Sequence, residues 1–526
     1  MSRPGIDRVF ERRLSSLVNG GEPQILQGGR KGVEKESLRV RPDGTLARTP
    51  HPASLGSALT NEHITTDYSE ALLELVTPAF TQSWELLQYL LDLHQFVYRH
   101  LGDELLWATS MPCAIERDAD IPLAQYGRSH VGRMKTVYRN GLGLRYGRMM
   151  QAISGVHFNY SFPLRFWEAW AAARGAAAHG TPFISACYFD LLRNYRRHGW
   201  LVLYLFGVSP VVCKSFLRGR DPGLPDFGRG TAFEPYATSL RMSDVGYRNR
   251  NQAGLSVSVN SLEEYIHDLT RAITTPNAAY EALGVEVNGE YRQLNANILQ
   301  IENEYYSFIR PKRVARSGER PTKALRRAGV EYVEVRALDV SAFDPVGVNQ
   351  NKLRFLEAFL ALCLMKDSPP IAAAEQGVLD QNHLIVARRG REPDLTLQRD
   401  GRSVPMLEWA RELLDSLAGI CEVLDSGDPG RPYSQALATQ SAKIEDVALT
   451  PSARLMNELS AGESFFDLAL RMSAMHKAYF LDLYPPNEER LREFSEAARE
   501  SLAAQQALEA ADRGTFGEYL ARYFAD

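Results

Sequence analysis

Residues 33–40 read Val33-Glu34-Lys35-Glu36-Ser37-Leu38-Arg39-Val40, and residues 331–338 read Glu331-Tyr332-Val333-Glu334-Val335-Arg336-Ala337-Leu338. In each segment two charged residues stand one position apart in a stretch bounded by apolar residues, Val33 and Leu38 in the first and Val333 and Ala337 in the second. If each segment is a β-strand, its side chains alternate between two faces, so Glu34 and Glu36 project together, as do Glu334 and Arg336. Both segments therefore predict strands with charge on one face of a sheet.

Carboxylates gathered on one sheet face repel one another unless positive charge lies there. Suitable counter-charges are divalent cations that carry phosphates, because Mg²⁺ takes oxygen ligands and completes its octahedron with nucleotide oxygens. For Glu34 and Glu36 a second interpretation stays open. In it, the strand is a solvent-exposed edge with Lys35 and Arg39 as ion-pair partners.

The composition is that of a soluble globular protein. With 526 residues and 44% hydrophobic content, the chain can bury a large core in one large domain or several. Its 60 Lys and Arg against 64 Asp and Glu give a net charge of −4, which provides no electrostatic reason to expect a nucleic acid or an anionic membrane as partner. Local clusters of residues must therefore carry the function.

No segment has the length and apolar character of a membrane anchor or leader. Met1–Arg8 lacks the apolar core of a secretory signal. The longest apolar run, Trp200–Cys213, is interrupted by Gly207 and Pro210 and is shorter than the roughly 20 residues that span a bilayer, so we expect it in the buried core.

The cysteines indicate reduced thiols in a cytoplasmic protein. They are odd in number, far apart and never arranged as Cys-x-x-Cys, which argues against a disulfide framework and a zinc ribbon. The five are Cys113, Cys187, Cys213, Cys363 and Cys421.

The order of the patterns predicts an α+β protein. Residues 1–20 are expected to form a helix, an α+β stretch runs from about 28 to 344, and helical periodicity follows. Apolar residues recur at three- and four-residue spacing in Trp84–Val97 and Leu353–Leu364, which predicts two packed helices. The charged, alanine-rich stretch Pro486–Asp526 predicts helices on the outside.

Three further segments add polar groups to the predicted sheet. Ile64–Val76 contains Asp67, which a helix cap would also explain, and Glu74, which a strand places on the same face as Leu72 and Val76. In Ser154–Phe162, His157 alternates with aromatic residues and so faces a polar interior, as a ligand or as a structural histidine. Residues 295–313 look like a long strand whose basic end meets phosphate or surface acids.

Together these segments place at least five carboxylates and one histidine on alternating positions. They predict a curved, mostly antiparallel sheet that forms an open funnel with an acidic inner face and helices outside. Familiar nucleotide signatures are missing: Gly28–Gly32 lacks Walker spacing, and Gly141–Gly147 misses the dinucleotide fingerprint by one residue. ATP, if it binds, therefore binds through metal ions and arginines.

These motifs resemble the proteobacterial type of glutamate–cysteine ligase, also called γ-glutamylcysteine synthetase. The resemblance runs in order from about residue 24 to about residue 365. It rests on Gly32–Val40, Gly56–Thr60, Ile64–Pro78, Leu123–Gly127, Gln151–Asn159, Pro235–Tyr247, Leu299–Tyr306, Ile309–Arg313 and Glu331–Arg336.

The resemblance implies a cytoplasmic enzyme with a glutamine synthetase-like core that joins L-glutamate to L-cysteine with ATP and Mg²⁺, or Mn²⁺. The glutamate γ-carboxylate first receives the terminal phosphoryl group of ATP, and γ-glutamylcysteine, ADP and phosphate are formed in the first step of glutathione synthesis. It further implies one catalytic unit over residues 1–526, with a metal- and ATP-binding α+β core at about 24–345 and a mainly helical region at about 346–526. Feedback by glutathione is a hypothesis, which unchanged initial rates in the presence of glutathione would reject.

The resemblance also implies roles for individual residues. Arg336 contacts the transferred phosphoryl group, and Arg241 holds glutamate and phosphate charge, although a structural ion pair of Arg241 with Asp244 is the alternative. The implied metal ligands are Glu34, Glu36, Asp67, Glu74, His157 and Glu334. The implied acceptor pocket is formed by Tyr68, Tyr138, Gln151, Tyr247 and Tyr306.

Some questions stay open at the level of sequence. Without the resemblance, aromatic residues at these spacings would be core residues more often than pocket residues. The family often has phenylalanine at position 68, so the hydroxyl of Tyr68 could alter acceptor choice. No residue stands out as a base for the cysteine amine. Alternative functions are a related carboxylate–amine ligase with another acceptor or ammonia, a metal-dependent hydrolase, or a non-catalytic metal-binding protein.

Overall fold

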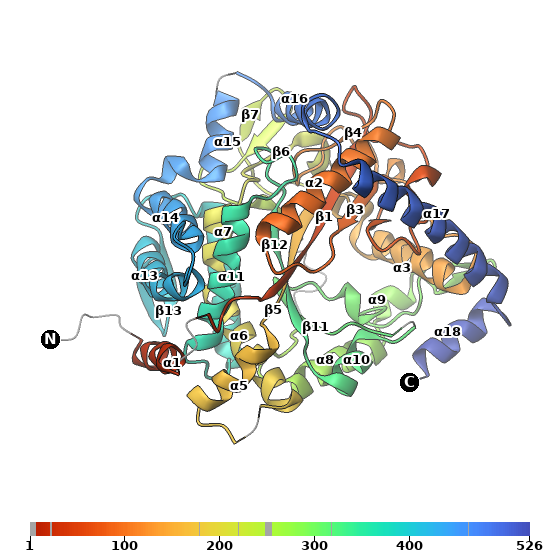
Figure 1. Ribbon diagram of the computed structural model, residues 1–526. Coiled ribbons are helices and arrows are strands. Elements are labelled where there is room, and N and C mark those ends of the chain that lie inside the picture. Colours follow the sequence, from red (N-terminus) through yellow and green to blue (C-terminus); the bar gives the residue numbers. More distant parts are fainter. Residues whose placement is uncertain are drawn as a thin grey trace.

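The two charged segments form strands β1 (Arg30–Val40) and β12 (Tyr332–Asp339) of one antiparallel sheet in the computed structural model (Figure 1). The structure describes residues 7–20, 24–177, 179–218, 220–247, 255–316, 318–460 and 462–525. Within these residues the sheet has seven strands in the order β11-β12-β5-β1-β3-β2, and β4 pairs with β1. The remaining strands of this sheet are β2 (Ile64–Thr66), β3 (Leu72–Val76), β4 (Leu105–Leu106), β5 (Gly155–Ser161) and β11 (Ile309–Lys312).

One face of the sheet is covered by helices. The apolar residues of the alternating pattern, such as Val33, Phe158 and Val333, are fully buried and pack with these helices in one hydrophobic core. The predicted helices at 84–97 and 353–364 are thereby confirmed, as is the burial of the apolar run that begins at Trp200. The covering helices are α2 (Ser83–His100), α6 (Thr181–His198), α7 (Trp200–Phe206) and α11 (Gln350–Met365).

The strand register gathers the polar residues on the opposite face. In the antiparallel pairs, Glu34 lies opposite His157, Glu36 lies opposite Glu74, and Glu334 lies opposite Asn159. Side chains directly opposite one another across two strands share a face of the sheet. The predicted alternation is therefore confirmed, and the acids of three strands lie together with His157 of a fourth.

Helices dominate the chain after residue 350, as predicted. The last two, drawn in blue in Figure 1, return to the amino-terminal part, where α17 (Glu488–Ala511) contacts α2 and α18 (Phe516–Phe524) contacts α3 (His130–Tyr146). The others are α12 (Ala373–Arg389), α13 (Met406–Leu424), α14 (Pro432–Glu445), α15 (Pro451–Ser460) and α16 (Phe465–Ala478), with a hairpin of β13 (Thr396–Arg399) and β14 (Arg402–Pro405).

Smaller elements complete the described chain, and none of its helices combines the length and apolarity that a bilayer crossing needs. The predicted amino-terminal helix is present as Arg8–Asn19, while residues 1–6 lie outside the described residues. The smaller elements are α1 (Arg8–Asn19), α4 (Arg148–Gln151), α5 (Leu164–Ala173), α8 (Leu262–Thr274), α9 (Ala278–Glu281), α10 (Pro321–Ala328), β6 (Val211–Cys213), β7 (Asp226–Gly228), β8 (Thr231–Phe233), β9 (Glu286–Val287) and β10 (Glu290–Tyr291).

The prediction of a long strand over residues 295–313 is wrong except for its last part, because only Ile309–Lys312 forms a strand. Before it, side chains bond to the backbone in place of a neighbouring strand: Asn295 donates to the Gln300 carbonyl at 2.9 Å, and Asn297 to the Ile273 carbonyl at 2.6 Å. Asparagine side chains commonly compete with strand pairing in this way.

The prediction of five reduced thiols is also wrong, because Cys113 and Cys213 form a disulfide. They are 100 residues apart in sequence, but the fold brings their Cα atoms to 5.4 Å, within the range that a disulfide bridges. The three remaining cysteines are free and buried. Sequence spacing carried no sign of this pairing, since the contact depends on the tertiary fold.

A buried ion pair joins the sheet to its helix layer. Lys31 of β1 and Glu357 of α11 are 2.6 Å apart, their side chains are each 1% exposed, and Tyr433 donates a hydrogen bond to Glu357 at 2.7 Å. We expect Glu357→Gln to lower the free energy of unfolding by about 3–5 kcal/mol, because the Lys31 ammonium would stay buried without its counter-charge. Chemical denaturation measures this difference.

The matched control is Glu392→Gln, which removes the exposed ion pair with Arg389 and is expected to cost about 0–1 kcal/mol. Equal losses of stability in the two variants would contradict the importance of the buried pair.

Candidate active site

A cavity of about 470 Å³ lies over the polar face of the sheet. Every residue predicted for the site lines it, although these residues come from segments spread over some three hundred positions. They are Glu34, Glu36, Asp67, Tyr68, Glu74, Tyr138, Gln151, His157, Arg241, Tyr247, Tyr306, Glu334 and Arg336.

The acidic residues surround one histidine. Glu34, Glu74 and His157 each offer one ligand atom, and these three atoms lie within 4.8 Å of one another. His157 Nδ1 is 3.1 Å from Glu34 Oε2, and His157 Nε2 is 3.8 Å from Glu36 Oε1. Glu34, Glu74 and His157 form a donor set that suits Mg²⁺ or Mn²⁺, and Glu36 adds a carboxylate beside the other ring nitrogen.

Two acids of the cluster, Glu74 and Glu36, are buried without enough positive charge beside them. Burial raises the pKa of Glu74 well above its usual value, and the charges of Glu34, Asp67 and Glu36 raise it further. Burial likewise raises the pKa of Glu36. A divalent cation among them would offset both effects, because an opposite charge favours the ionised form of a carboxyl group.

Glu334 lies between the acidic cluster and the cationic side chains of Lys312 and Arg336. Burial acts to raise its pKa, but Lys312 and Arg336 outweigh it and hold the pKa well below the usual value. Glu334 Oε1 lies 3.1 Å from Arg336 Nη1 and 3.6 Å from Lys312 Nζ. Its other oxygen is buried and has no hydrogen-bond partner among the described residues, which leaves it available as a metal ligand.

Arg241 does not form the alternative ion pair with Asp244. Asp244 instead lies 3.3 Å from Arg388, whereas the Arg241 side chain is 1% exposed and reaches the cavity. Arg241 Nη2 donates a hydrogen bond to the Arg336 carbonyl at 3.1 Å, and its guanidinium lies 5.1 Å from the centre of the Tyr247 ring. The two arginines predicted for catalysis are therefore in direct contact.

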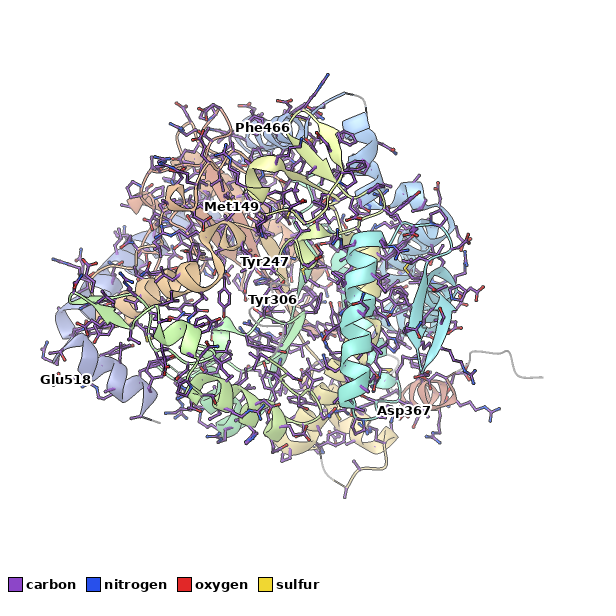
Figure 2. The ribbon with its side chains drawn as sticks, turned by 180° about the vertical axis from the view of Figure 1, so that it is seen from behind. Met149, Tyr247, Tyr306, Asp367, Phe466 and Glu518 are labelled. Atoms are coloured by element: carbon purple, nitrogen blue, oxygen red, sulfur yellow. A yellow bond between two sulfur atoms is a disulfide. The ribbon has the colours of Figure 1, made fainter. Side chains whose placement is uncertain are left out.

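Aromatic side chains form another wall of the cavity. Tyr247 and Tyr306 stack with ring centres 4.7 Å apart, and Figure 2 shows them next to each other in the middle of the molecule. Tyr247 donates its hydroxyl hydrogen to the Ile153 carbonyl at 2.8 Å. The buried hydroxyl of Tyr68 has no hydrogen-bond partner among the described residues. This wall is apolar with a few polar points, as small-molecule pockets generally are.

Sequence reasoning missed the cations that α3 contributes. Lys135 and Arg139 line the cavity one helical turn apart, and both lie over the ring of Tyr126, at 5.1 and 4.5 Å. Lys135 lies three positions before Tyr138 and four before Arg139, and this spacing could have identified them, because residues three and four apart share a helix face. Tyr523 of α18 also lines the cavity and lies beyond the region of the resemblance.

A larger cavity, of about 760 Å³, lies between α6, α12 and α13 and contains none of the predicted residues. Its main cations are already paired with acids. Arg197 pairs with Glu375, Arg399 with Glu412, and Lys366 with Asp7. The residues predicted for the site therefore line the smaller cavity over the sheet and not this larger one.

Gly155 of β5 gives Arg241 the space to enter the cavity. A β-carbon at this position would overlap the Arg241 guanidinium, at 2.7 Å from its Cζ. We expect Gly155→Ala to displace Arg241 and lower kcat/KM by at least about tenfold, because small displacements of binding groups have large kinetic effects. Steady-state kinetics together with the melting temperature measure the change.

The control is Gly32→Ala in β1, whose added methyl group would meet only ordinary contacts from 3.6 Å outward. Unchanged kinetics of Gly155→Ala would show that Arg241 is not held by this close approach.

Comparison with known proteins identifies the family. A family model described as glutamate–cysteine ligase matches residues 14–386. Glutamate–cysteine ligases from Alcanivorax borkumensis and Pseudomonas putida are 49% and 48% identical, over 98% of this chain and 99% and 98% of those proteins.

Solved structures agree. The crystal structure of a glutamate–cysteine ligase from Francisella tularensis in complex with AMP has a TM-score of 0.89 and 37% identity, and covers 95% of this chain and 98% of that chain. A bifunctional glutathione synthetase from Pasteurella multocida shares the fold, with a TM-score of 0.71 and 22% identity over 89% of this chain and 55% of that chain. The protein belongs to the glutamate–cysteine ligase family.

Proposed function

We propose that the protein joins the γ-carboxylate of L-glutamate to the amine of L-cysteine, using ATP, through a γ-glutamyl phosphate intermediate. The observation that carries this proposal is the convergence of Glu34, Glu74, His157, Glu334 and Arg336 in one cavity. A carboxylate is a poor electrophile, so it must first receive a phosphoryl group. The site needs cations on both sides of that group and a pocket for the attacking amine.

The acids and arginines divide this task. We propose that Glu34, Glu36, Asp67, Glu74, His157 and Glu334 hold Mg²⁺ or Mn²⁺, which when bound neutralises phosphate charge. Arg336 contacts the transferred phosphoryl group, and Arg241 holds the charge of glutamate and phosphate with its planar fork. Tyr68, Tyr138, Gln151, Tyr247 and Tyr306 enclose the acceptor. In this arrangement the sheet forms a funnel of the glutamine synthetase kind, with residues 24–345 as its core and 346–526 as its helical support.

The nucleotide base has a suitable place beside the acidic cavity. An adjoining cavity of about 350 Å³ shares Arg310 and Lys312 with it and is lined by Tyr265 and Tyr332. We place the base between these aromatic side chains, so that Arg310 and Lys312 lie along the triphosphate. The AMP complex of the Francisella tularensis relative supports nucleotide binding in this family.

Tyr68 is the observation that favours a second candidate, a ligase with another acceptor. Its buried hydroxyl, without a partner among the described residues, would contact a polar acceptor side chain better than a thiol. We further propose that glutathione, which contains the product dipeptide, competes for the same cavity.

The deciding experiment measures phosphate release with ATP, Mg²⁺, glutamate and each of the twenty amino acids as acceptor. We expect release only when glutamate and an acceptor are both present, with cysteine as the best acceptor. Another best acceptor would favour the second candidate. Release without any acceptor, or metal-dependent hydrolysis without a nucleotide, would overturn the ligase.

A further inference from the structure

The last residue of β12 is turned toward the site by an irregularity in its strand. Val335 pairs with Phe158 of β5, but Leu338 pairs with Val156, so β12 carries one extra residue between these points. An extra residue of this kind re-aims the side chains that follow it. Asp339 therefore pairs with Gly155 and shares the polar face of the sheet with Glu334.

Asp339 is completely buried and holds three hydrogen bonds. Its Oδ2 accepts from the Val208 amide at 2.8 Å and from the Ser209 hydroxyl at 2.7 Å, and its Oδ1 accepts from the Ser239 hydroxyl at 2.9 Å. The same Oδ1 lies 3.8 Å from Arg241 Nη1. Asp339 is thus a fixed negative charge directly beside the Arg241 guanidinium.

The segment that carries Arg241 is fastened to the same point. Ser209 and Ser239 form a parallel bridge, the Arg241 amide donates to the Ser209 hydroxyl at 3.3 Å, and Arg241 Nη2 donates to the Arg336 carbonyl of β12. Strand β12 therefore carries Glu334 of the acidic cluster, Arg336, and Asp339 as the counter-charge of Arg241.

We propose that Asp339 is a positioning residue that fixes the guanidinium of Arg241 for glutamate. This inference rests on the role proposed above for Arg241. A free arginine side chain loses rotational freedom when it binds a carboxylate, and a buried counter-charge removes that loss in advance. Asp339 does not itself line the cavity, so it acts through Arg241.

The test is Asp339→Asn, which keeps the volume but removes the charge. We expect the KM for glutamate to rise about tenfold, within the range that coupling in one hydrogen-bonded network gives, while the KM for ATP stays within about twofold. The matched control is Asp244→Asn, three residues from Arg241 in sequence but paired with Arg388, and its kinetics should equal those of the wild type.

A double-mutant cycle with Arg241→Lys separates positioning from general structural damage. If Asp339 acts through Arg241, then Asp339→Asn has little further effect on glutamate binding in the Arg241→Lys background. An equal effect in both backgrounds, or an unchanged glutamate KM, would overturn the inference. If Asp339→Asn does not fold, Ser239→Ala removes one of its hydrogen bonds and must raise the glutamate KM by a smaller factor.

The same double-mutant cycle can also be measured by calorimetric titration, which gives the dissociation constant of glutamate for each variant. A wild-type protein that binds glutamate but forms no γ-glutamyl product would refute the proposed function, while the cycle would still decide on Asp339.

Discussion

Arg336→Ala is expected to lower kcat for γ-glutamylcysteine formation by about 10²–10³-fold, the usual effect of removing one preorganised electrostatic group. Arg336 Nη1 is held 3.1 Å from Glu334 Oε1 at the wall of the cavity. Charge spreads over the outer oxygens of a phosphoryl group during transfer. A cation fixed beside these oxygens therefore stabilises the transition state more than the ground state. Rates of ADP formation at saturating glutamate, cysteine and ATP measure kcat.

Two further variants sharpen this expectation. Arg336→Lys keeps the charge but not the planar fork, and its kcat should lie between those of the wild type and Arg336→Ala. Arg326→Ala, on the exposed side of α10, should leave kcat unchanged. The loss expected for such a group is about 10²-fold or more. The proposed role would be excluded if the kcat of Arg336→Ala stayed within about threefold of the wild type.

Glu34→Gln is expected to reduce ligase activity by at least about 10²-fold and to weaken Mn²⁺ binding. Glu34 is bonded on both oxygens, to His157 at 3.1 Å and to Asn159 at 2.9 Å, so its position is fixed before any cation arrives. Metal ions supply several kcal/mol of charge stabilisation at such sites, and an amide is a much weaker ligand than a carboxylate. Calorimetry with Mn²⁺ measures binding independently of turnover.

Glu331→Gln is the matched control. Glu331 belongs to the same kind of charged segment, but it is half exposed and pairs with Arg313 at 3.3 Å. Both Mn²⁺ affinity and activity should be unchanged in this variant. Unaltered Mn²⁺ binding by Glu34→Gln would remove Glu34 from the set of ligands.

The face on which each side chain lies could be predicted, because side chains of a strand repeat every two residues. Three or four residues are enough to recognise this repeat. Glu34, Glu36 and Glu334 show this, since each is flanked by residues that are buried on the other face. The edge-strand alternative for β1 is wrong, because β1 lies between β5 and β3 in the sheet. The roles of the individual acids and arginines stay predictions until variants are measured.

Features that depend on distant contacts could not be predicted. The disulfide joins positions 100 residues apart, and the single extra residue that re-aims Asp339 leaves no mark in composition or periodicity. The loop before β11 contains residues that suit a strand, but Asn297 donates to the distant Ile273 carbonyl and Asn295 to the Gln300 carbonyl within the loop. In each case tertiary structure decides between alternatives that the local sequence leaves equal.

The packing of α18 makes one wall of the cavity depend on the contact between two helices that are far apart in sequence. Phe516 and Leu520 pack with Met134 and Val137 of α3, and Tyr523 reaches the cavity itself. Detachment of α18 from α3 would therefore leave this wall of the cavity incomplete.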